Sequence, residues 1–358
     1  VTTSVTNMTS MFDGATAYNN GIGQLVHTLD NPNAYGTSAN DYFGYSVAIT
    51  DTYTIVGAYG EGDATGTSSG KAYIYNNATG ALVHTLDNPN PYGTSTDDYF
   101  GESVAITDNY AIVGAWAEDD AGVTFSGKAY IYNNTTGALV HTLDNPTAYG
   151  TSAGDSFGRS VAITDTYAIV GARNEDDAGG TDSGKAYIFN TVTGALLHTL
   201  DNPNAYGTSA NDYFGITVAI SDTYAIVSAY FENDAGGTFS GKAYIYNNTT
   251  GALVHTLDNP TAYGTSLNDS FGRSLAITDT YAIVGAYGED DAGGTDSGKA
   301  YIFNLNDISG WDTGAVSNMT SMFNSAASFD QDISSWDVSL IASEPTNFDN
   351  NTLASWTT

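Results

Sequence analysis

The chain of 358 residues contains no cysteine, and only 8 lysines and arginines stand against 40 aspartates and glutamates. Without cysteine there is no disulfide, no thiolate metal site and no cysteine nucleophile. The net charge of −32 disfavours binding to nucleic acids and anionic membranes, because both are themselves negatively charged. No apolar run reaches the length of a membrane-spanning helix, so membrane insertion is not expected. Such a charge suits a surface in saline water or one screened by divalent cations.

Five near-identical copies of a 57-residue unit occupy most of the sequence. The phrase His-Thr-Leu-Asp-Asn-Pro marks them, starting at His27, His84, His141, His198 and His255. A repeat of this length indicates an array of modules whose apolar faces are buried by their neighbours. Function is therefore sought where the copies differ.

Each copy carries four short runs with the composition of β-strands. In the first copy these are Ser46–Thr50, Tyr53–Tyr59, Lys71–Asn76 and Leu82–Asp87, separated by clusters of Asp, Asn, Gly and Ser. Both faces of the runs are apolar or small, which suits a sheet stacked between two others. The predicted fold is all-β, a five-bladed β-propeller of four-stranded blades.

The two ends of the array are complementary. A lone fourth run, Leu25–Asp30, precedes the first full copy, and the last copy stops after its third run, Lys299–Asn304. If the first run pairs with the last three, five complete blades form a ring without free strand edges. We therefore predict a propeller closed by its N-terminal strand.

The repeated motifs resemble a known family. The five Phe-Gly pairs begin at Phe43, Phe100, Phe157, Phe214 and Phe271. Each is followed by Val-Gly-Ala and then by Gly-Lys-Ala-Tyr, except that Ser228 replaces the glycine of Val-Gly-Ala in the fourth copy. These motifs resemble the FG-GAP repeats of integrin α-chain propellers and of many bacterial surface proteins. The resemblance implies a propeller in an extracellular protein that serves binding or assembly.

The calcium site of that family is not expected here. Its calcium-binding members carry an Asp-rich loop between the first and second strands, whereas this connection is only Thr50-Asp51-Thr52. One aspartate cannot supply the about six to eight oxygen ligands that calcium takes. A different acidic loop, between the second and third strands, offers candidate metal ligands, with solvated turn carboxylates as the alternative. These candidates are Glu118, Asp119, Asp120, Glu175, Asp176, Asp177, Glu289, Asp290 and Asp291. No cofactor is required, and weakly bound calcium is the ion that this loop suggests.

The flanks belong to a different repeat. The phrase at residues 5–12 returns almost unchanged at residues 316–323, and Trp311-Asp312 returns 25 residues later as Trp336-Asp337. These phrases resemble the repeats of BspA-like bacterial surface proteins, which are similar to leucine-rich solenoids. We therefore expect the propeller to be inserted within a small solenoid made by the two chain ends. The predicted domains are residues 1–22 and 305–358 for the solenoid and residues 23–304 for the propeller.

Because the sequence begins with Val, we expect a processed mature chain, and both resemblances imply an extracellular or cell-surface location. Asn-x-Thr triplets, for example at Asn77 and Asn134, are potential glycan acceptors, although such triplets arise by chance in an Asn- and Thr-rich chain.

No catalytic constellation is present in the sequence. The five histidines share one repeat position, and so do the five lysines, which follow the glycine before the third strand. Five copies of a general base, each without a distinct partner, are not an enzyme's active site. We interpret the histidines as packing residues and the lysines as edge or turn residues, and no enzymatic activity is predicted.

Positions at which the copies differ in size and charge are candidates for contact with partners, since interfaces favour exposed aromatic residues and arginine. The candidates are Trp116, Phe125, Arg173, Tyr230, Phe231 and Phe239. Unconstrained variation on a solvated face is the alternative.

Two functions of different classes follow. The first is a non-enzymatic structural subunit of an extracellular filament or surface array, which binds copies of itself through the solenoid ends and displays the propeller outward. The second is a cell-surface adhesin or carbohydrate-binding propeller, whose partners are glycans or cell-surface proteins. An enzyme is a distant third.

Overall fold

The computed structural model describes residues 25–32, 39–62, 66–89, 96–120, 123–146, 153–177, 180–203, 209–233, 237–260, 267–292, 294–305, 316–320 and 336–341. The chain divides into two compact units, Val1–Val218 (unit 1) and Ala219–Thr358 (unit 2). Within the described ranges the structure contains strands and no helix, so the predicted all-β class is confirmed. Accordingly, these ranges contain no helix long and apolar enough to span a membrane.

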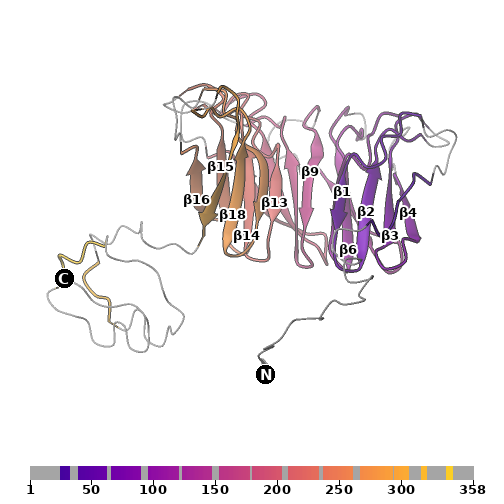
Figure 1. Ribbon diagram of the computed structural model, residues 1–358, viewed down its shortest axis with the longest axis horizontal. Helices are drawn as coiled ribbons and strands as arrows, with labels where there is room; N and C mark the ends of the chain where they lie inside the picture. Colours follow the sequence, from indigo (N-terminus) through magenta and orange to yellow (C-terminus); the bar gives the residue numbers. More distant parts are fainter. Residues whose placement is uncertain are drawn as a thin grey trace, which may run out of the picture. The chain divides into compact units, whose positions relative to one another are not determined.

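The strands form five antiparallel sheets, here called blades, in which sequence neighbours lie side by side (Figure 1). Blade 1 contains β1 (Val47–Ile49), β2 (Tyr53–Ala58), β3 (Lys71–Asn76) and β4 (Leu82–Asp87). Blade 2 contains β5 (Ser103–Ile106), β6 (Tyr110–Ala115), β7 (Lys128–Asn133) and β8 (Leu139–Asp144). Blade 3 contains β9 (Phe157–Ile163), β10 (Tyr167–Ala172), β11 (Lys185–Asn190) and β12 (Leu196–Asp201). Blade 4 contains β13 (Val218–Ile220), β14 (Tyr224–Ala229), β15 (Lys242–Asn247) and β16 (Leu253–Asp258). Blade 5 contains β17 (Phe271–Ile277), β18 (Tyr281–Ala286) and β19 (Lys299–Asn304).

Short polar turns fix the register of each blade. In the turn from β3 to β4, the Asn76 side chain accepts hydrogen bonds from the backbone N–H groups of Ala78 and Thr79, both at 3.1 Å. Gly80 closes this turn with φ +69°, a left-handed conformation that glycine adopts without steric cost. The Asn-x-x-Thr-Gly sequence therefore specifies the hairpin turn.

Neighbouring blades bury each other's apolar faces. In unit 1, Ile55 and Ile74 of blade 1 pack in one cluster with Phe100, Val113 and Tyr130 from blade 2 and the loop before it. The same kind of cluster joins blade 2 to blade 3 in unit 1 and blade 4 to blade 5 in unit 2. A side chain as large as isoleucine contributes roughly 1.5–3 kcal/mol when fully buried, so these contacts dominate the stability of the array.

A buried pair of polar residues recurs in every blade. Tyr130 in β7 donates its hydroxyl hydrogen to the carboxyl group of Glu118 at 2.7 Å, and Glu118 is fully buried. The same pair occurs at Tyr73–Glu61, Tyr187–Glu175, Tyr244–Glu232 and Tyr301–Glu289. A buried carboxyl group without a partner would cost several kcal/mol, roughly 2–7, so the tyrosine hydroxyl is part of the core.

The histidines lie at the boundary between blades, in agreement with their interpretation as packing residues. The Nε2 atom of His84 in β4 lies 2.9 Å from the carbonyl oxygen of Asn134, in the turn from β7 to β8. His141 makes the equivalent contact with Val192 at 2.9 Å. Asn134 is itself fully buried and donates to the carbonyl oxygen of Thr107, so in the folded chain this predicted glycan acceptor is inaccessible.

The structure does not confirm the predicted closure of the ring. Blade 5 has three strands, and Leu25–Asp30, the expected fourth strand, has no strand pairing. The predicted N-terminal solenoid segment, residues 1–22, lies outside the described residues. Of the C-terminal segment only Leu305 and residues 316–320 and 336–341 are described, without strand or helix, so the solenoid also stays a prediction.

Candidate functional site

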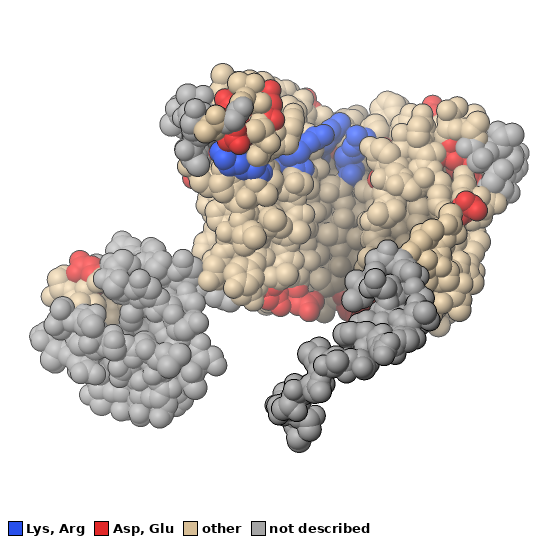
Figure 2. All heavy atoms as spheres, in the orientation of Figure 1, with Lys and Arg blue, Asp and Glu red and all other residues tan. Residues whose placement is uncertain are grey.

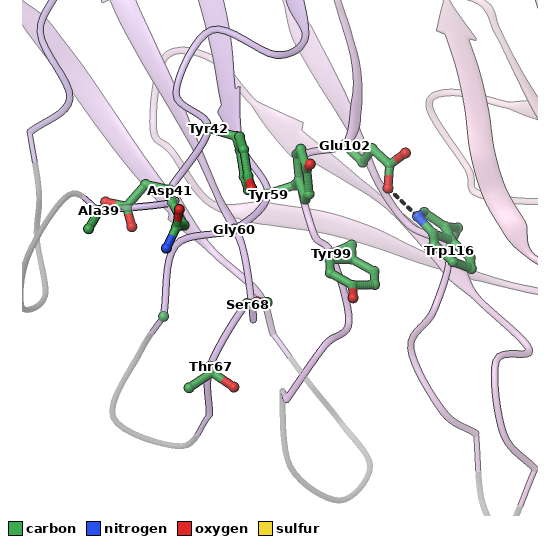
Figure 3. Close-up of a pocket in the computed structure, with 12 residues that line it drawn as sticks. Ala39, Asp41, Tyr42, Tyr59, Gly60, Thr67, Ser68, Tyr99, Glu102 and Trp116 are labelled. Atoms are coloured by element: carbon green, nitrogen blue, oxygen red, sulfur yellow. Dashed lines mark hydrogen bonds between the residues drawn. The ribbon is translucent and has the colours of Figure 1, made fainter.

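Aromatic side chains form a continuous strip in unit 1, on loops at one end of blades 1 and 2. The rings of Tyr42 and Tyr59 stack with their centroids 5.0 Å apart, and Tyr59 is followed by Tyr99 at 5.8 Å. Tyr99 then stacks on Trp116 at 5.5 Å, and Tyr45 packs edge-on against Tyr59 at 4.7 Å. We call Tyr42, Tyr59, Tyr99 and Trp116 the aromatic strip (Figure 3).

The aromatic strip lines a pocket of about 880 Å³. Its other lining residues include the polar side chains of Asn40, Asp41, Thr67, Ser68 and Glu102. The loop before β1, the loop between β2 and β3, and the corresponding loops of blade 2 supply these residues. The volume lies within the range of about 300–1,000 Å³ that small-molecule sites occupy in proteins.

Two rings of the strip stand on backbone of unusual conformation. Tyr42 has φ 55° and Tyr99 has φ 56°, in the left-handed region that bulky side chains rarely adopt. The conformation recurs at this position in all five copies, so it is a property of the repeated loop. In blades 3 and 5 the same left-handed position holds Ser156 and Ser270, so the fold itself does not require an aromatic ring there.

One end of the strip carries a charged cluster. Glu102 accepts a hydrogen bond from Trp116 Nε1, drawn as a dashed line in Figure 3, and forms an ion pair with Arg159 NH1 at 3.0 Å. The guanidinium carbon of Arg159 lies over the Trp116 ring, 4.5 Å from its centroid. Glu102 and one face of Trp116 are therefore already occupied by residues of the chain itself.

Burial and negative neighbours keep the phenols of the strip protonated. Burial raises the pKa of Tyr59 above its ordinary value, and nearby Tyr42 and Glu102 add to this rise. Burial also raises the pKa of Tyr99, with Asp97 and Glu102 adding to it. Both hydroxyl groups can therefore donate hydrogen bonds at neutral pH.

The predicted partner residues fall into different places. Trp116 lines the pocket, whereas Arg173 is half-buried and donates from Nε to Asn174 Oδ1 at 3.1 Å. The side chain of Phe125 is 49% exposed, and its backbone is left-handed with φ 53°. Phe125 is not among the residues that line the pocket.

The remaining three candidates pack together in unit 2. Tyr230 and Phe231 lie 4.5 Å apart, and Phe231 meets Phe239 edge-on at 5.5 Å. Tyr230 is only 6% exposed, and Arg273 covers its ring at 5.0 Å. Phe239 of this cluster is 44% exposed.

The candidate metal ligands serve the fold in the described residues. Glu118, Glu175 and Glu289 are buried against tyrosines and are therefore not solvated turn carboxylates. Asp119, Asp176 and Asp290 each accept a hydrogen bond from the backbone N–H six residues later, at 2.9–3.0 Å. Asp177 and Asp291 accept from Gly180 and Gly294, and Asp120 Oδ1 lies 3.6 Å from Lys128 Nζ. In the ranges that the structure describes, no three His, Cys, Asp or Glu side chains gather as a metal site would require.

Tyr42, Tyr59, Tyr99 and Glu102 were not among the site residues predicted from the sequence. Tyr59 occupies the same repeat position as Trp116, and Glu102 occupies another position at which the copies differ. The position of Tyr42 and Tyr99 holds Tyr in copies 1, 2 and 4 and Ser in copies 3 and 5. That variation was the available signal. Nothing in the sequence marks these tyrosines as left-handed, because tyrosine rarely adopts that conformation.

The comparison with known families agrees with the repeat geometry. The sequence matches the FG-GAP repeat at residues 33–75, 91–132, 147–189, 204–246 and 261–303, together more than half of the chain. The chain belongs to the FG-GAP repeat family. No curated protein matches the sequence.

The FG-GAP motif forms the joint between blades in unit 1. Phe100 is fully buried beneath Tyr130, with ring centroids 5.8 Å apart, and Gly101 has φ 90°. The carbonyl oxygen of Gly101 accepts a hydrogen bond from Ser46 of the preceding blade at 2.7 Å. The FG-GAP loop thus links one blade to the next directly after the strip residue Tyr99.

A second family matches both chain ends. Residues 1–34 and 298–357 match a family described as a Mycoplasma protein of unknown function, DUF285. The two parts of this match lie on either side of the FG-GAP repeats. The resemblances of the flanks to BspA-like repeats and of the repeats to integrin propellers stay predictions.

Proposed function

We propose that this chain is a non-enzymatic extracellular binding protein, whose FG-GAP repeats form a closed five-bladed propeller and whose aromatic pocket contacts the ligand. The observation that carries this proposal is the strip of four aromatic rings in unit 1, two of them on left-handed backbone. The buried glutamates recur in every blade against a tyrosine and serve the core, so they do not form a distinct catalytic group.

The placement of Leu25–Asp30 supports closure of the ring. The hydroxyl group of Tyr75 in blade 1 donates to the carbonyl oxygen of Asp30 at 3.3 Å, as that of Tyr132 in blade 2 donates to Asp87 at 3.1 Å. Asn31 donates to Asp41 at 2.8 Å, as Asn88 donates to Asp98. Leu25–Asp30 therefore contacts blade 1 in the way that β4 contacts blade 2.

The edge strand of blade 5, β19, is the strand with which Leu25–Asp30 would pair in a closed ring. In β3 and β4, Lys71 lies opposite Asp87 and Ala72 lies opposite Leu86. Applied to blade 5, this register places Lys299 opposite Asp30 and Ala300 opposite Leu29. In blades 1 to 4 the equivalent lysine bonds to the Asp that ends the fourth strand, whereas Lys299 bonds to Glu289 instead.

Cysteine crosslinking tests the closure on a chain without native cysteines. The double variant Leu29→Cys/Ala300→Cys is expected to form an intramolecular disulfide under mild oxidation, because directly opposite residues of paired strands bring their Cβ atoms within reach. Leu25→Cys/Ala300→Cys, four residues out of register, is the matched control. Equal crosslinking in both variants, or a disulfide only between two chains, would contradict a closed ring.

Adhesion measurements test the binding function. Beads coated with the purified chain are expected to adhere to cell surfaces, and beads coated with Tyr99→Ser/Trp116→Arg to adhere less. These substitutions introduce the residues that blade 3 holds at the same positions, Ser156 and Arg173, so the fold should accept them. Failure of the native chain to adhere to any surface would remove the proposed function.

A structural subunit of a filament or surface array is the second candidate. The split match to DUF285 on both sides of the repeats favours it, because the two ends of the chain then belong to one module that copies can share. Sedimentation of the full chain over a range of concentrations tests this candidate. A monomer at every concentration would exclude self-assembly through the ends.

A further inference from the structure

We propose that the aromatic pocket of unit 1 binds a neutral glycan chain, laid along the aromatic strip. This inference rests on the proposed binding function and specifies its ligand class. It concerns the pocket lined by Tyr42, Tyr59, Tyr99 and Trp116.

The strip supplies adjacent aromatic surface: Tyr42 stacks on Tyr59 and Tyr99 stacks on Trp116, and a ligand would contact the ring edges and faces that these pairs leave uncovered. Successive ring centroids are 5.0, 5.8 and 5.5 Å apart from Tyr42 to Trp116, so the apolar surface continues from blade 1 to blade 2. Tyr42 keeps 53% of its surface exposed. Sugar rings have one face of C–H groups and stack on aromatic rings of this kind, which combine an apolar body with a polar edge.

The pocket also supplies hydrogen-bonding groups of both kinds. Asn40, Thr67 and Ser68 line it, and each of these side chains both donates and accepts. The hydroxyl groups of Tyr59 and Tyr99 stay protonated, since burial raises the pKa of both. A ligand rich in hydroxyl groups, which also donate and accept, fits such a lining.

The charges of the site disfavour an anionic ligand. Asp41 and Glu102 line the pocket, and the chain carries a net charge of −32. On the face seen in Figure 2, the surfaces along the strands carry few charges; Asp and Glu lie near the strand ends, and Lys and Arg gather near the upper ends. A sulfated or sialylated glycan would bring negative charge to these carboxylates.

A cationic ligand is also disfavoured, because the chain's own groups already engage both carboxylates. Arg159 pairs with Glu102 at 3.0 Å and covers Trp116, where an aromatic cage would hold a ligand's cation. Asp41 accepts from Asn31 at 2.8 Å. The charge balance of the pocket therefore favours an uncharged ligand.

The other blades show that the strip is an addition to the fold. Ser156 takes the place of Tyr99 in blade 3 with φ 58°, so the left-handed loop forms without a ring. In unit 2, Tyr230 is 6% exposed and lies under Arg273. We therefore expect the pocket of unit 1 to bind glycans without help from the cluster of unit 2.

Binding of soluble oligosaccharides to the full chain tests the proposal. Neutral hexose oligosaccharides are titrated and followed by calorimetry and by tryptophan fluorescence, with sialylated and sulfated oligosaccharides of similar length as the comparison. We expect binding of the neutral series, with Tyr99→Ser and Trp116→Arg each weakening it roughly tenfold, because each removes an aromatic ring from the pocket lining.

Phe125→Asp is the matched control, because blade 3 holds Asp182 at that position and Phe125 does not line the pocket. It should leave glycan affinity unchanged. Circular dichroism and thermal unfolding confirm that each variant is folded. Equal affinity for neutral and anionic glycans, or unchanged affinity in both pocket variants, would overturn the proposal.

The outcomes separate the ligand class from the binding function. Adhesion that depends on Tyr99 and Trp116 but is not competed by neutral oligosaccharides would overturn the glycan proposal and leave the proposed function standing. Absence of any adhesion together with absence of glycan binding would remove both.

Discussion

Blades 2 and 5 have nearly the same sequence and very different burial. The strand β7 reads Lys-Ala-Tyr-Ile-Tyr-Asn and is buried at five of its six positions, whereas β19 reads Lys-Ala-Tyr-Ile-Phe-Asn and has no fully buried residue. Ile131 in β7 is 0% exposed and its equivalent Ile302 in β19 is 71% exposed. The contrast shows that a blade cannot bury its apolar face by itself, and that its place in the array decides how far that face is buried.

The largest expected effect comes from truncating these two isoleucines. Ile131→Ala should lower the free energy of unfolding by about 2–5 kcal/mol, because it leaves a cavity in the cluster between blades 2 and 3. If the ring closes as proposed, Ile302→Ala should cost nearly as much, since blade 5 then gains a neighbour. Urea unfolding of both variants measures the comparison.

Thr135→Ala, on an exposed turn of blade 2, introduces the alanine that blade 1 holds at that position and controls for the effect of substitution itself. A loss below about 1 kcal/mol for Ile302→Ala beside a full loss for Ile131→Ala would mean that the face of blade 5 stays open in solution.

The second prediction concerns pH. Burial raises the pKa of Glu118 in blade 2 to about 8, against the opposing hydrogen bond from Tyr130. Burial, with Glu175 adding to it, also raises the pKa of Asp155 to about 7. Because these folded-state pKa values lie above the unfolded ones, the neutral carboxyls stabilise the fold. Their contribution is full below about pH 4 and is lost as the pH rises through about 7 to 8.

Stability should therefore fall between about pH 4 and pH 8, by an amount on the order of a few kcal/mol at about 1.4 kcal/mol for each pKa unit. Glu118→Gln, which stays neutral, should flatten this dependence. In blade 5 the equivalent Glu289 lies 2.6 Å from Lys299 Nζ, so Glu289→Gln removes an ion pair and serves as the contrast. Thermal unfolding across this range is the measurement, and a native chain that gains stability as the pH rises would contradict the assignment.

The third prediction concerns the joint between blades. A Cβ atom on Gly114 would lie 2.0 Å from the carbonyl oxygen of Gly158, so Gly114→Ala should destabilise the chain by about 1–3 kcal/mol. Ser228 holds this position in blade 4, where the loop at Gly272 lies farther from its neighbours. A Cβ atom on Gly272 would lie 3.0 Å from the carbonyl oxygen of Lys242, whereas a Cβ atom on Gly158 would lie 2.2 Å from the carbonyl oxygen of Lys128.

Ser228→Gly is the matched control, with an expected change below about 1 kcal/mol. The two variants are compared by denaturant unfolding. If Gly114→Ala proved as harmless as Ser228→Gly, the close approach of the two loops would not constrain the blade spacing.

The smallest expected effect comes from single hydrogen bonds to the outer strands. Tyr132→Phe removes the bond to Asp87, and Tyr75→Phe removes the bond to Asp30. Each should cost about 1 kcal/mol, the net value of one hydrogen bond. Similar losses in both variants, measured by urea unfolding, would show that Leu25–Asp30 is held on blade 1 as firmly as β4 is on blade 2. No loss from Tyr75→Phe alone would weaken the case for closure.

The strands were predictable because each is a short apolar run between turn residues. The predicted Lys71–Asn76 and Leu82–Asp87 agree with β3 and β4 at both ends, and Tyr53–Tyr59 differs from β2 by one residue. The closure stays a prediction, since a run identical to β4 fits the edge of its own ring and the edge of another chain equally well.

The site was predictable only where the copies differ. Trp116 was identified by its variation and lines the pocket, but Tyr42 and Tyr99 gain their positions from left-handed loops that their residue type does not indicate. The buried state of Glu118 was missed as well, because its partner Tyr130 lies twelve residues away and meets it only after the strands pair.

The left-handed loop position, which accepts Tyr in one blade and Ser in another, also bears on how such arrays diversify. Exchange of whole repeats between near-identical gene segments would move a ring from one blade to the next without disturbing the strands. Recognition would then change in steps of one module, while the frame that carries it is inherited intact.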